Sequence, residues 1–295
     1  MSDEIRAIAK TTVQGIIDAV REKEGSTEPI PVNALADRIG ALQIGGGNVF
    51  AEYISGTKTE LYPEDFRGVS TIGASMFYYN SSLSYVEMPE TVTTLQDKAF
   101  NYAKISTIKT YATNIGASAL YLSSSTEPHI YLLSNTFDTL GKTVFGSDSH
   151  IHFNSEQVFD NFLIKASANP DNYPFNSELK QLYIGDTLLT EINVSAEITY
   201  LSDYFLAGLS GIKKGIEQVI FEGDVTSVGT HSFYNCQSMK VIDFTKCTQV
   251  PTLRGTYAFY NMSNKKYQIK VPSALYDEWI SATNWSSVAN KIVAV

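Results

Sequence analysis

A short phrase recurs along this chain, and it constrains the fold more than any other feature. An apolar anchor residue is followed five positions later by phenylalanine at Ile72 and Phe77, and the same pair returns elsewhere. The anchor recurs mostly at intervals of 20 to 27 residues, and it occupies Ile72, Leu95, Ile115, Leu140, Leu201, Val228 and Leu253. This period is typical of stacked repeats with one short strand each, whose apolar sides are buried only by neighbouring copies.

The segments between the phrases predict strands. Residues 85–89 and 241–244 alternate apolar and polar side chains, which indicates strands with one buried face. The anchor and the phenylalanine of a phrase are expected to point inward together across a turn. Each repeat would then contribute a strand, a turn and a return.

A second duplication accounts for the 61 residues between Leu140 and Leu201, which are too many for one repeat. Residues 151–162 parallel residues 269–280, with Phe162 matching Trp279 after a shift of one position. Each segment predicts a strand, a serine N-cap at Ser155 or Ser273, and a short helix. We interpret both as caps that close a stack. The chain is therefore expected to hold two modules, residues 48–176 and 177–295.

The N-terminal 47 residues differ in character. Residues 4–23 predict an amphipathic helix, and residues 33–42 a second, shorter one. The apolar face of the first helix is formed by Ile5, Ile8, Val13, Ile16, Ile17 and Val20. Three glycines at 45–47 form the clearest linker in the chain. We predict that residues 1–47 are a leader for attachment or assembly; a self-contained helical hairpin is the alternative.

Composition excludes several classes of protein. The hydrophobic share of 43% excludes an intrinsically disordered chain. The net charge of −9 disfavours binding to nucleic acid or to an anionic membrane surface, because both need clustered lysine and arginine. No apolar stretch approaches the ~20 residues that cross a bilayer, and the acidic start is unlike a secretion signal. We expect neither membrane insertion nor secretion by that route.

The phrase at Ile72-Gly73…Phe77-Tyr78-Tyr79-Asn80-Ser81-Ser82-Leu83 resembles the BspA-type leucine-rich repeat. Its best second copy is Val228-Gly229…Phe233-Tyr234-Asn235-Cys236-Gln237-Ser238-Met239. Residues 271–279 resemble the C-terminus of repeat proteins carried by bacteriophages and prophages, and the first 45 residues resemble the leader of phage tail and other virion proteins. These resemblances imply a virion protein, assembled in the host cytoplasm, which displays its repeats and has no chemistry of its own.

The expected fold class is α+β: a helical leader followed by two BspA-like solenoid modules, each closed by a strand–helix cap. The expected function is host attachment by a tail or head fibre, with other virion proteins bound through the leader. A host glycan or protein would be the outer partner, and the class favours a homo-oligomer, with a trimer as first guess. A purely architectural virion protein, a bacterial surface adhesin and a depolymerase are the alternatives. We expect no enzyme activity and no cofactor.

Tyrosine is the unusual residue of the composition, with 18 copies. Five of them recur next to the phenylalanine of a phrase: Tyr78, Tyr79, Tyr102, Tyr234 and Tyr260. If the phenylalanines are buried, some of these rings face outward as a ladder, which makes them the candidate contact surface. The alternative is half-buried packing within the turns.

Histidine offers the sharpest candidate for a metal site. On a strand, His150 and His152 would share one face, as in a His-x-His metal site. No cysteine or third histidine lies nearby in the sequence, and His129 and His231 are isolated, so we favour ordinary strand histidines and expect no metal. A partly exposed turn position is expected for His231.

Two further sets of residues could carry chemistry. Cys236 and Cys247 are expected to be small buried side chains, with a disulfide between neighbouring repeats as the alternative. Paired carboxylates of a glycosidase would have to converge across a groove. Pairs that a stack could bring together are Glu87 with Glu90 and Asp203 with Glu222. Nothing in the sequence marks either as a catalytic pair, and no catalytic residue is expected.

Overall fold

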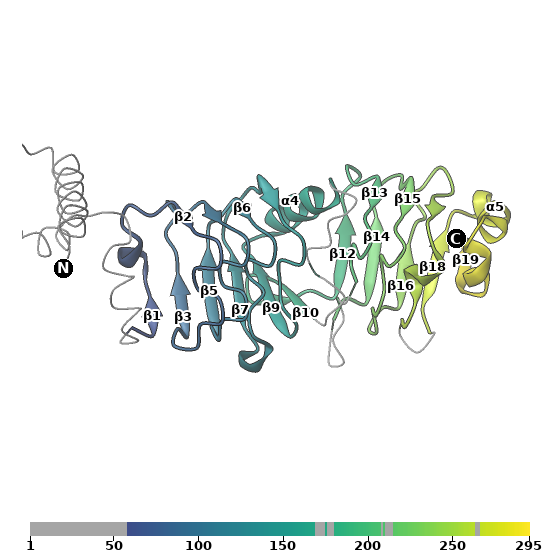
Figure 1. The fold of residues 1–295 in the computed structure, drawn as a ribbon. Coiled ribbons are helices and arrows are strands. Elements are labelled where there is room, and N and C mark those ends of the chain that lie inside the picture. The colour runs from purple at the N-terminus through teal and green to yellow at the C-terminus, as the bar shows by residue number, and fades with distance from the viewer. Residues whose placement is uncertain (1–57, 169–174, 176–179, 208, 210–214, 263–265) are drawn as a thin grey trace, which may run out of the picture.

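The computed structural model describes residues 58–168, 175, 180–207, 209, 215–262 and 266–295. The predicted leader, with its apolar residues between Ile5 and Val20, lies outside this part, so that prediction stays untested. The described chain forms an elongated stack of coils in which most strands run parallel (Figure 1). The predicted repeat solenoid is confirmed in this respect.

The N-terminal half of the stack contains two sheets. The larger has the order β1 (Glu60–Leu61), β3 (Tyr85–Glu87), β5 (Thr107–Thr110), β7 (His129–Leu132), β9 (Ser149–Phe153), β10 (Lys180–Ile184) and β11 (Thr187–Leu188). The smaller consists of β2 (Thr71–Ile72), β4 (Thr94–Leu95), β6 (Asn114–Ile115) and β8 (Thr139–Leu140). All neighbouring pairs are parallel except β10 and β11, which form an antiparallel hairpin.

The C-terminal half repeats this plan. Its larger sheet has the order β12 (Glu191–Val194), β14 (Gln218–Phe221), β16 (Val241–Asp243), β18 (Gln268–Val271) and β19 (Ile292–Ala294). Its smaller sheet consists of β13 (Tyr200–Leu201), β15 (Ser227–Val228) and β17 (Thr252–Leu253). One coil is therefore a strand of the larger sheet, a short strand of the smaller sheet, and a turn that leads to the next coil.

The repeated phrase builds the interior. Every predicted anchor lies in a two-residue strand of a smaller sheet, and all except the half-buried Leu140 are buried. The phenylalanines of the phrase are buried as predicted, and Phe77 stacks on Phe100 of the next coil with ring centroids 4.8 Å apart. The buried residues of both halves form one continuous apolar cluster from Leu61 to Ile292.

The predicted strands between the phrases are confirmed, with an alternating burial pattern. In the larger N-terminal sheet, equivalent residues of five strands lie side by side in register and are buried: Val86, Ile108, Ile130, Ile151 and Leu182. The residues before and after them point to the outer face. The chemistry of that outer face is therefore set by the polar positions of each strand.

Few helices interrupt the described stack. The longest is α4 (Glu156–Ser167), and the C-terminal end has α5 (Tyr276–Ser281). Single-turn or slightly longer 3-10 segments complete the set: η2 (Pro63–Phe66), η3 (Ser124–Thr126), η4 (Thr256–Phe259), η6 (Ser273–Leu275) and η7 (Trp285–Lys291). Ser155 caps α4 as predicted, because its hydroxyl accepts a hydrogen bond from the Val158 N–H at 3.3 Å.

The predicted N-cap at Ser273 is wrong. Ser273 is the first residue of η6, α5 begins only after Leu275, and neither start has a side-chain cap bond. Pro272 holds the preceding backbone extended, and the Ser273 N–H donates to the carbonyl of Val295 at 3.1 Å. The serine is therefore held against the last strand of the sheet rather than at the start of a helix.

The two larger sheets are separated between β11 and β12. The segment 180–188, which the sequence analysis places at the start of the second module, pairs with β9 and extends the N-terminal sheet. The strand–helix segment β9–α4 therefore precedes the end of its sheet instead of terminating it. After α4 the chain returns to the same sheet, because β10 pairs with β9 and Leu182 lies beside Ile151, where both are buried.

Candidate contact surface

The turn that follows each short strand is held to the next coil by backbone hydrogen bonds. The N–H groups of Ser75, Phe77 and Tyr79 donate to carbonyls of the next coil at 3.0, 2.8 and 2.9 Å. Alternate residues thus anchor the turn, and Phe77 between them points into the core. This ladder fixes where the side chains around the phenylalanine leave the surface.

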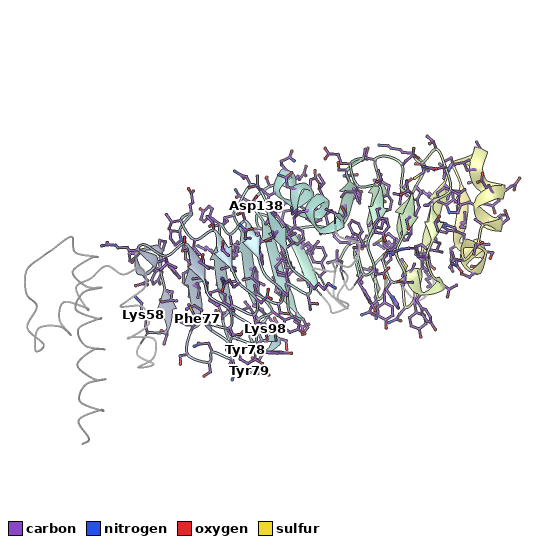
Figure 2. All side chains as sticks on the ribbon, turned by 45° about the horizontal axis from the view of Figure 1, so that its top comes forward. Lys58, Phe77, Tyr78, Tyr79, Lys98 and Asp138 are labelled. Atoms are coloured by element: carbon purple, nitrogen blue, oxygen red, sulfur yellow. The ribbon has the colours of Figure 1, made fainter. Side chains whose placement is uncertain are left out.

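An N-terminal tyrosine cluster lies on this turn edge, formed by Tyr78, Tyr79, Tyr102 and Tyr121. Tyr79 stacks on Tyr102 with centroids 4.9 Å apart, which is the spacing of adjacent strands, and Tyr78 meets the Tyr79 ring edge-on at 4.6 Å. Tyr79 is 61% exposed. Figure 2 shows Tyr78 and Tyr79 at the lower edge of this half, on the side away from Asp138.

Tyr79 and Tyr102 lie in the left-handed backbone region, with φ of 53° and 57°. This conformation is unfavourable for a bulky residue, and glycine or asparagine normally occupies it. In the C-terminal half the corresponding turn positions are Asn235 and Asn261, with φ of 61° and 56°. The coil itself therefore needs only a residue that tolerates positive φ, and the tyrosines occupy this position at a conformational cost.

A C-terminal aromatic cluster lies on the turns of the other half and consists of Tyr204, His231, Tyr234, Tyr257 and Tyr260. The His231 ring stacks between Tyr204, at 4.6 Å, and Tyr257, at 5.7 Å, while Tyr234 stacks on Tyr260 at 5.8 Å. Tyr257 and Tyr260 are 56% and 54% exposed. Each coil of this half contributes at least one ring.

The five predicted contact tyrosines thus divide between the two clusters. Tyr78, Tyr79 and Tyr102 belong to the first, and Tyr234 and Tyr260 to the second. Four members of the clusters were not predicted: Tyr121, Tyr204, His231 as a ring of the stack, and Tyr257. Tyr204 and His231 each follow their anchor by three residues, so alignment on the anchors would have identified them.

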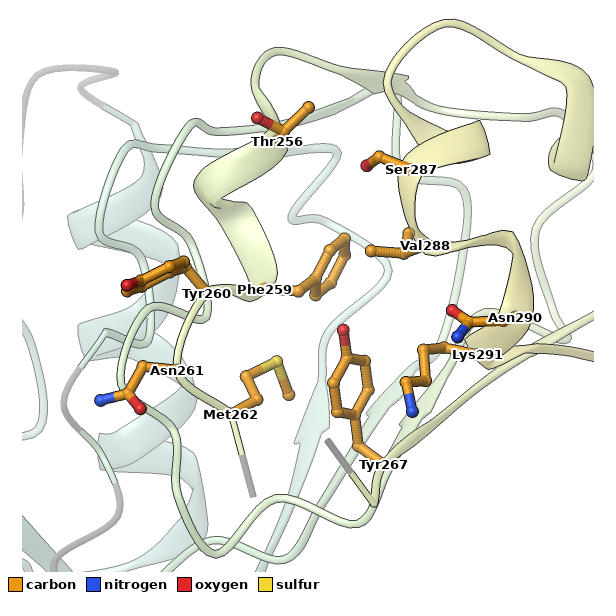
Figure 3. A pocket seen from close by; sticks show the side chains of 10 residues that line it. All are labelled: Thr256, Phe259, Tyr260, Asn261, Met262, Tyr267, Ser287, Val288, Asn290 and Lys291. Atoms are coloured by element: carbon orange, nitrogen blue, oxygen red, sulfur yellow. The ribbon is translucent and has the colours of Figure 1, made fainter. Parts of the chain in front are cut away.

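A cavity of about 690 Å³ lies beside the C-terminal aromatic cluster (Figure 3). It is lined by Thr256, Phe259, Tyr260, Asn261, Met262, Tyr267, Ser287, Val288, Asn290 and Lys291. Burial raises the pKa of Tyr267 to about 12. The Lys291 ammonium lies 5.5 Å from the centroid of the Tyr267 ring, a cation–π contact.

Three histidines meet on the outer face of the larger N-terminal sheet. His129, which is isolated in the sequence, lies beside His150 in register, and its Nδ1 is 2.9 Å from Nε2 of His152. Their ring nitrogens engage each other and neighbouring groups instead of converging on one point. Within the described residues, no group of three or more His, Cys, Asp or Glu side chains is arranged to hold a metal ion.

Both cysteines are free and buried, so the predicted burial is confirmed and the alternative of a disulfide is wrong. The Cys236 thiol donates to the carbonyl of Leu206 at 3.1 Å. Burial raises the pKa of the Cys247 thiol, which keeps this side chain protonated and unreactive.

Three of the four candidate acids have basic partners. Glu87 pairs with Lys109 at 3.3 Å and Asp203 with Arg254 at 2.7 Å, while Glu222 pairs with Lys246. The Tyr85 hydroxyl and Lys109 lower the pKa of Glu87. The lowered pKa of Glu87 contrasts with the raised pKa that a general acid requires.

Comparison with known protein families identifies the repeats. A family model described as a BspA type leucine-rich repeat region, in six copies, matches residues 49–169 and 211–278. No curated protein matches the chain. Among the described residues, no helix is both long and apolar enough to span a membrane. The family model covers well over half of the sequence, and the matched ranges include strands of both halves of the stack. The chain therefore belongs to the BspA-type leucine-rich repeat family.

Proposed function

We propose that this chain is a non-enzymatic attachment protein that contacts its target through the two clusters of aromatic residues. The observation that carries the proposal is the pair Tyr79 and Tyr102, which are exposed although their backbone positions disfavour tyrosine. Residues with a strained backbone conformation cluster at functional sites. The same position is filled by asparagine in the C-terminal half, so packing of the coil does not account for tyrosine.

Tyrosine suits such a surface chemically. Its ring provides a large contact area and its hydroxyl a hydrogen-bond donor and acceptor, at a low cost in side-chain entropy. An oligomer would present several copies of both clusters. Binding through several copies at once would raise the avidity without any new kind of contact. The target in this proposal is a glycan or protein on a bacterial surface.

The finer part of the proposal places the chain on a bacteriophage virion, as a tail or head fibre that is held by residues 1–47. Its support is the resemblance of the leader and of residues 271–279 to phage proteins. A bacterial surface adhesin is the second candidate, because BspA-type repeats are typical of surface and adhesion proteins. The proposal of a homo-oligomer, with a trimer as first guess, rests on the class of attachment proteins.

The contact surface is tested by the double variant Tyr79→Asn/Tyr102→Asn, measured in the full chain. Asparagine is the residue that the other half has at this turn position, so the fold is expected to be retained or slightly stabilised. Binding of the labelled protein to a panel of bacterial strains should fall at least tenfold. The matched control is Tyr62→Asn, which changes an exposed tyrosine outside both clusters and should bind normally. Equal binding by the folded double variant and the wild type would refute this role.

The location is tested separately, by immunoblotting density-gradient fractions of a lysate that carries the gene. The chain should band with phage particles and be absent from the cell-envelope fraction. Detection in the envelope fraction alone would overturn the virion proposal and favour the adhesin. Co-banding with particles but no binding to any strain would favour an architectural role.

A further inference from the structure

The cavity beside the C-terminal aromatic cluster lies where the series of repeated turns ends. In an earlier coil the turn is covered by the next one, because the Phe233 N–H donates to the carbonyl of Ala258 at 2.9 Å. The turn that contains η4 is the last copy of the phrase, and η7 lies beside it instead, with the Trp285 ring 5.5 Å from that of Phe259. The space between η4 and η7 is the cavity of about 690 Å³.

The hydroxyl of Tyr267 is the feature that points to a ligand. Tyr267 is 6% exposed, and within the described residues its hydroxyl has no hydrogen-bond partner. Figure 3 shows this hydroxyl pointing between Phe259 and Val288, into the cavity that all three residues line. An unpaired buried hydroxyl costs free energy. A polar group bound in the cavity would supply the missing hydrogen bond.

The remaining walls combine apolar surface with polar groups. Phe259, Met262 and Val288 provide the apolar part. Asn290 points from η7 towards Tyr267 (Figure 3), and its amide can both donate and accept hydrogen bonds. Lys291 is the one charged residue among the described lining residues, and its ammonium is already placed against the Tyr267 ring. The lining therefore suits a ligand that is itself part apolar and part polar.

The cavity is continuous with the C-terminal aromatic cluster through Tyr260. This residue lines the cavity, stacks on Tyr234 at 5.8 Å and is 54% exposed. A polymeric ligand with one unit in the cavity could therefore continue over the exposed ring of Tyr260.

We propose that this cavity binds one pyranose residue of a glycan, and that the Tyr267 hydroxyl and the Asn290 amide select it. A pyranose has a face of C–H groups that can pack on an aromatic ring, and hydroxyls that donate and accept hydrogen bonds. An apolar amino-acid side chain could fill the same volume but would leave the Tyr267 hydroxyl unpaired. The cavity has the size of a typical small-molecule site, about 300–1,000 Å³. This inference rests on the proposed attachment function and narrows its target from a glycan or protein to a glycan.

The test follows the methionine methyl groups by NMR in the full chain, isotope-labelled at the methyl carbon. Met262 lines the cavity, whereas Met76, Met88 and Met239 lie elsewhere in the stack and serve as internal references. The probes are glucose, galactose, mannose, N-acetylglucosamine and glucuronic acid at millimolar concentration. At least one of them should shift the Met262 signal saturably and leave the three reference signals in place. The absence of such a shift with every probe would overturn the proposal.

Two variants test the residues that carry the inference. Tyr267→Phe keeps the buried ring and should therefore retain the fold, but it should weaken the affinity for the active sugar about tenfold. Asn290→Trp places a bulky ring at an exposed position of the lining and should abolish the sugar-induced shift. Tyr276→Phe and Ser286→Trp make the same changes outside the lining and should bind as wild type. Wild-type affinity in both Tyr267→Phe and Asn290→Trp would overturn the proposal.

N-acetylphenylalanine amide represents a protein ligand in the same titration. A shift of Met262 by this probe and by none of the sugars would overturn the proposal in favour of a protein side chain. Failure of the attachment function gives a different result: the chain would bind a sugar in the cavity but would bind no bacterial strain. Conversely, strain binding that depends on Tyr79 and Tyr102, without sugar binding, would refute the cavity proposal alone.

Discussion

The two halves of the molecule have nearly the same interior and different surfaces. The stack of Phe77 on Phe100 in the first half corresponds to the stack of Phe233 on Phe259 in the second, at 4.8 and 5.5 Å. At the exposed turn position, however, the first half has tyrosines and the second has asparagines. On the outer sheet face, the first half has stacked tyrosine and histidine rings between β7 and β10, where the second half has side chains such as Ile220 and Asp243.

This difference distinguishes the residues that the coil needs for its packing from the residues that it only displays on its surface. Inward positions are dictated by stacking, because each must fill the space left by the neighbouring coil. Exposed positions face no such demand, so packing of the coil does not account for the tyrosines at positive φ in the first half. The comparison between the halves provides an internal control that a single repeat module would lack.

The largest expected effect comes from opening a cavity in one half at a time. Phe100→Ala and Phe233→Ala each remove a buried ring and should lower the free energy of unfolding by about 3–5 kcal/mol. Both tryptophans lie in the C-terminal half, so tryptophan fluorescence in a urea titration reports that half alone. Phe233→Ala should lower the urea concentration at the midpoint of the fluorescence transition. Phe100→Ala should lower the midpoint of the transition followed by circular dichroism, with little change in the fluorescence midpoint.

The variants Phe100→Ala and Phe233→Ala together test whether the two halves unfold independently. If Phe100→Ala moves the fluorescence midpoint as far as Phe233→Ala does, the two halves unfold as one cooperative unit, and the distinction between them is structural only. The wild-type titration, recorded with both probes, supplies the reference.

A smaller effect is expected at the glycine that follows the anchor. A Cβ on Gly229 would lie 2.5 Å from the backbone oxygen of Ser202 in the preceding coil, whereas on Gly73 it would meet only the flexible end of Met76 at 3.2 Å. Gly229→Ala should therefore destabilise by about 1–3 kcal/mol. Gly73→Ala should leave stability unchanged or raise it by up to about 1 kcal/mol. Thermal unfolding compares them, and equal losses would show that the close approach is not what requires glycine.

The smallest effect concerns Trp279, whose counterpart in the first half is Phe162. Both are fully buried, but the indole N–H of Trp279 finds no hydrogen-bond partner among the described residues, whereas that of Trp285 donates to the carbonyl of Pro251 at 2.7 Å. Trp285→Phe should therefore cost about 1 kcal/mol more than Trp279→Phe, because it leaves a buried acceptor unpaired. Urea titrations followed by circular dichroism measure the difference, and a larger loss for Trp279→Phe would contradict it.

The interior was predictable from the sequence because stacking imposes its period on buried residues. The anchors, the phenylalanines and the strands between them all follow from that period. The meeting of His129 with His150 and His152 was not predicted, since His129 and His150 are 21 residues apart and only the register of β7 with β9 joins them. That separation equals one coil, so a search for chemical groups at the repeat spacing would have found it. The cap predicted at Ser273 does not form, because Pro272 holds the preceding backbone extended and Ser273 becomes the first residue of η6.

The separation of the sheets between β11 and β12 has a mechanical consequence. Along the stack, hydrogen bonds between parallel strands run in the direction in which a tethered attachment protein would be pulled. At this one joint the described strands are not paired, and the load passes through the covalent chain and the apolar contacts of the continuous core. Apolar contacts are non-directional and tolerate sliding, unlike a ladder of aligned donors and acceptors. Under tension the joint should therefore yield first and act as a compliant hinge between two stiff segments.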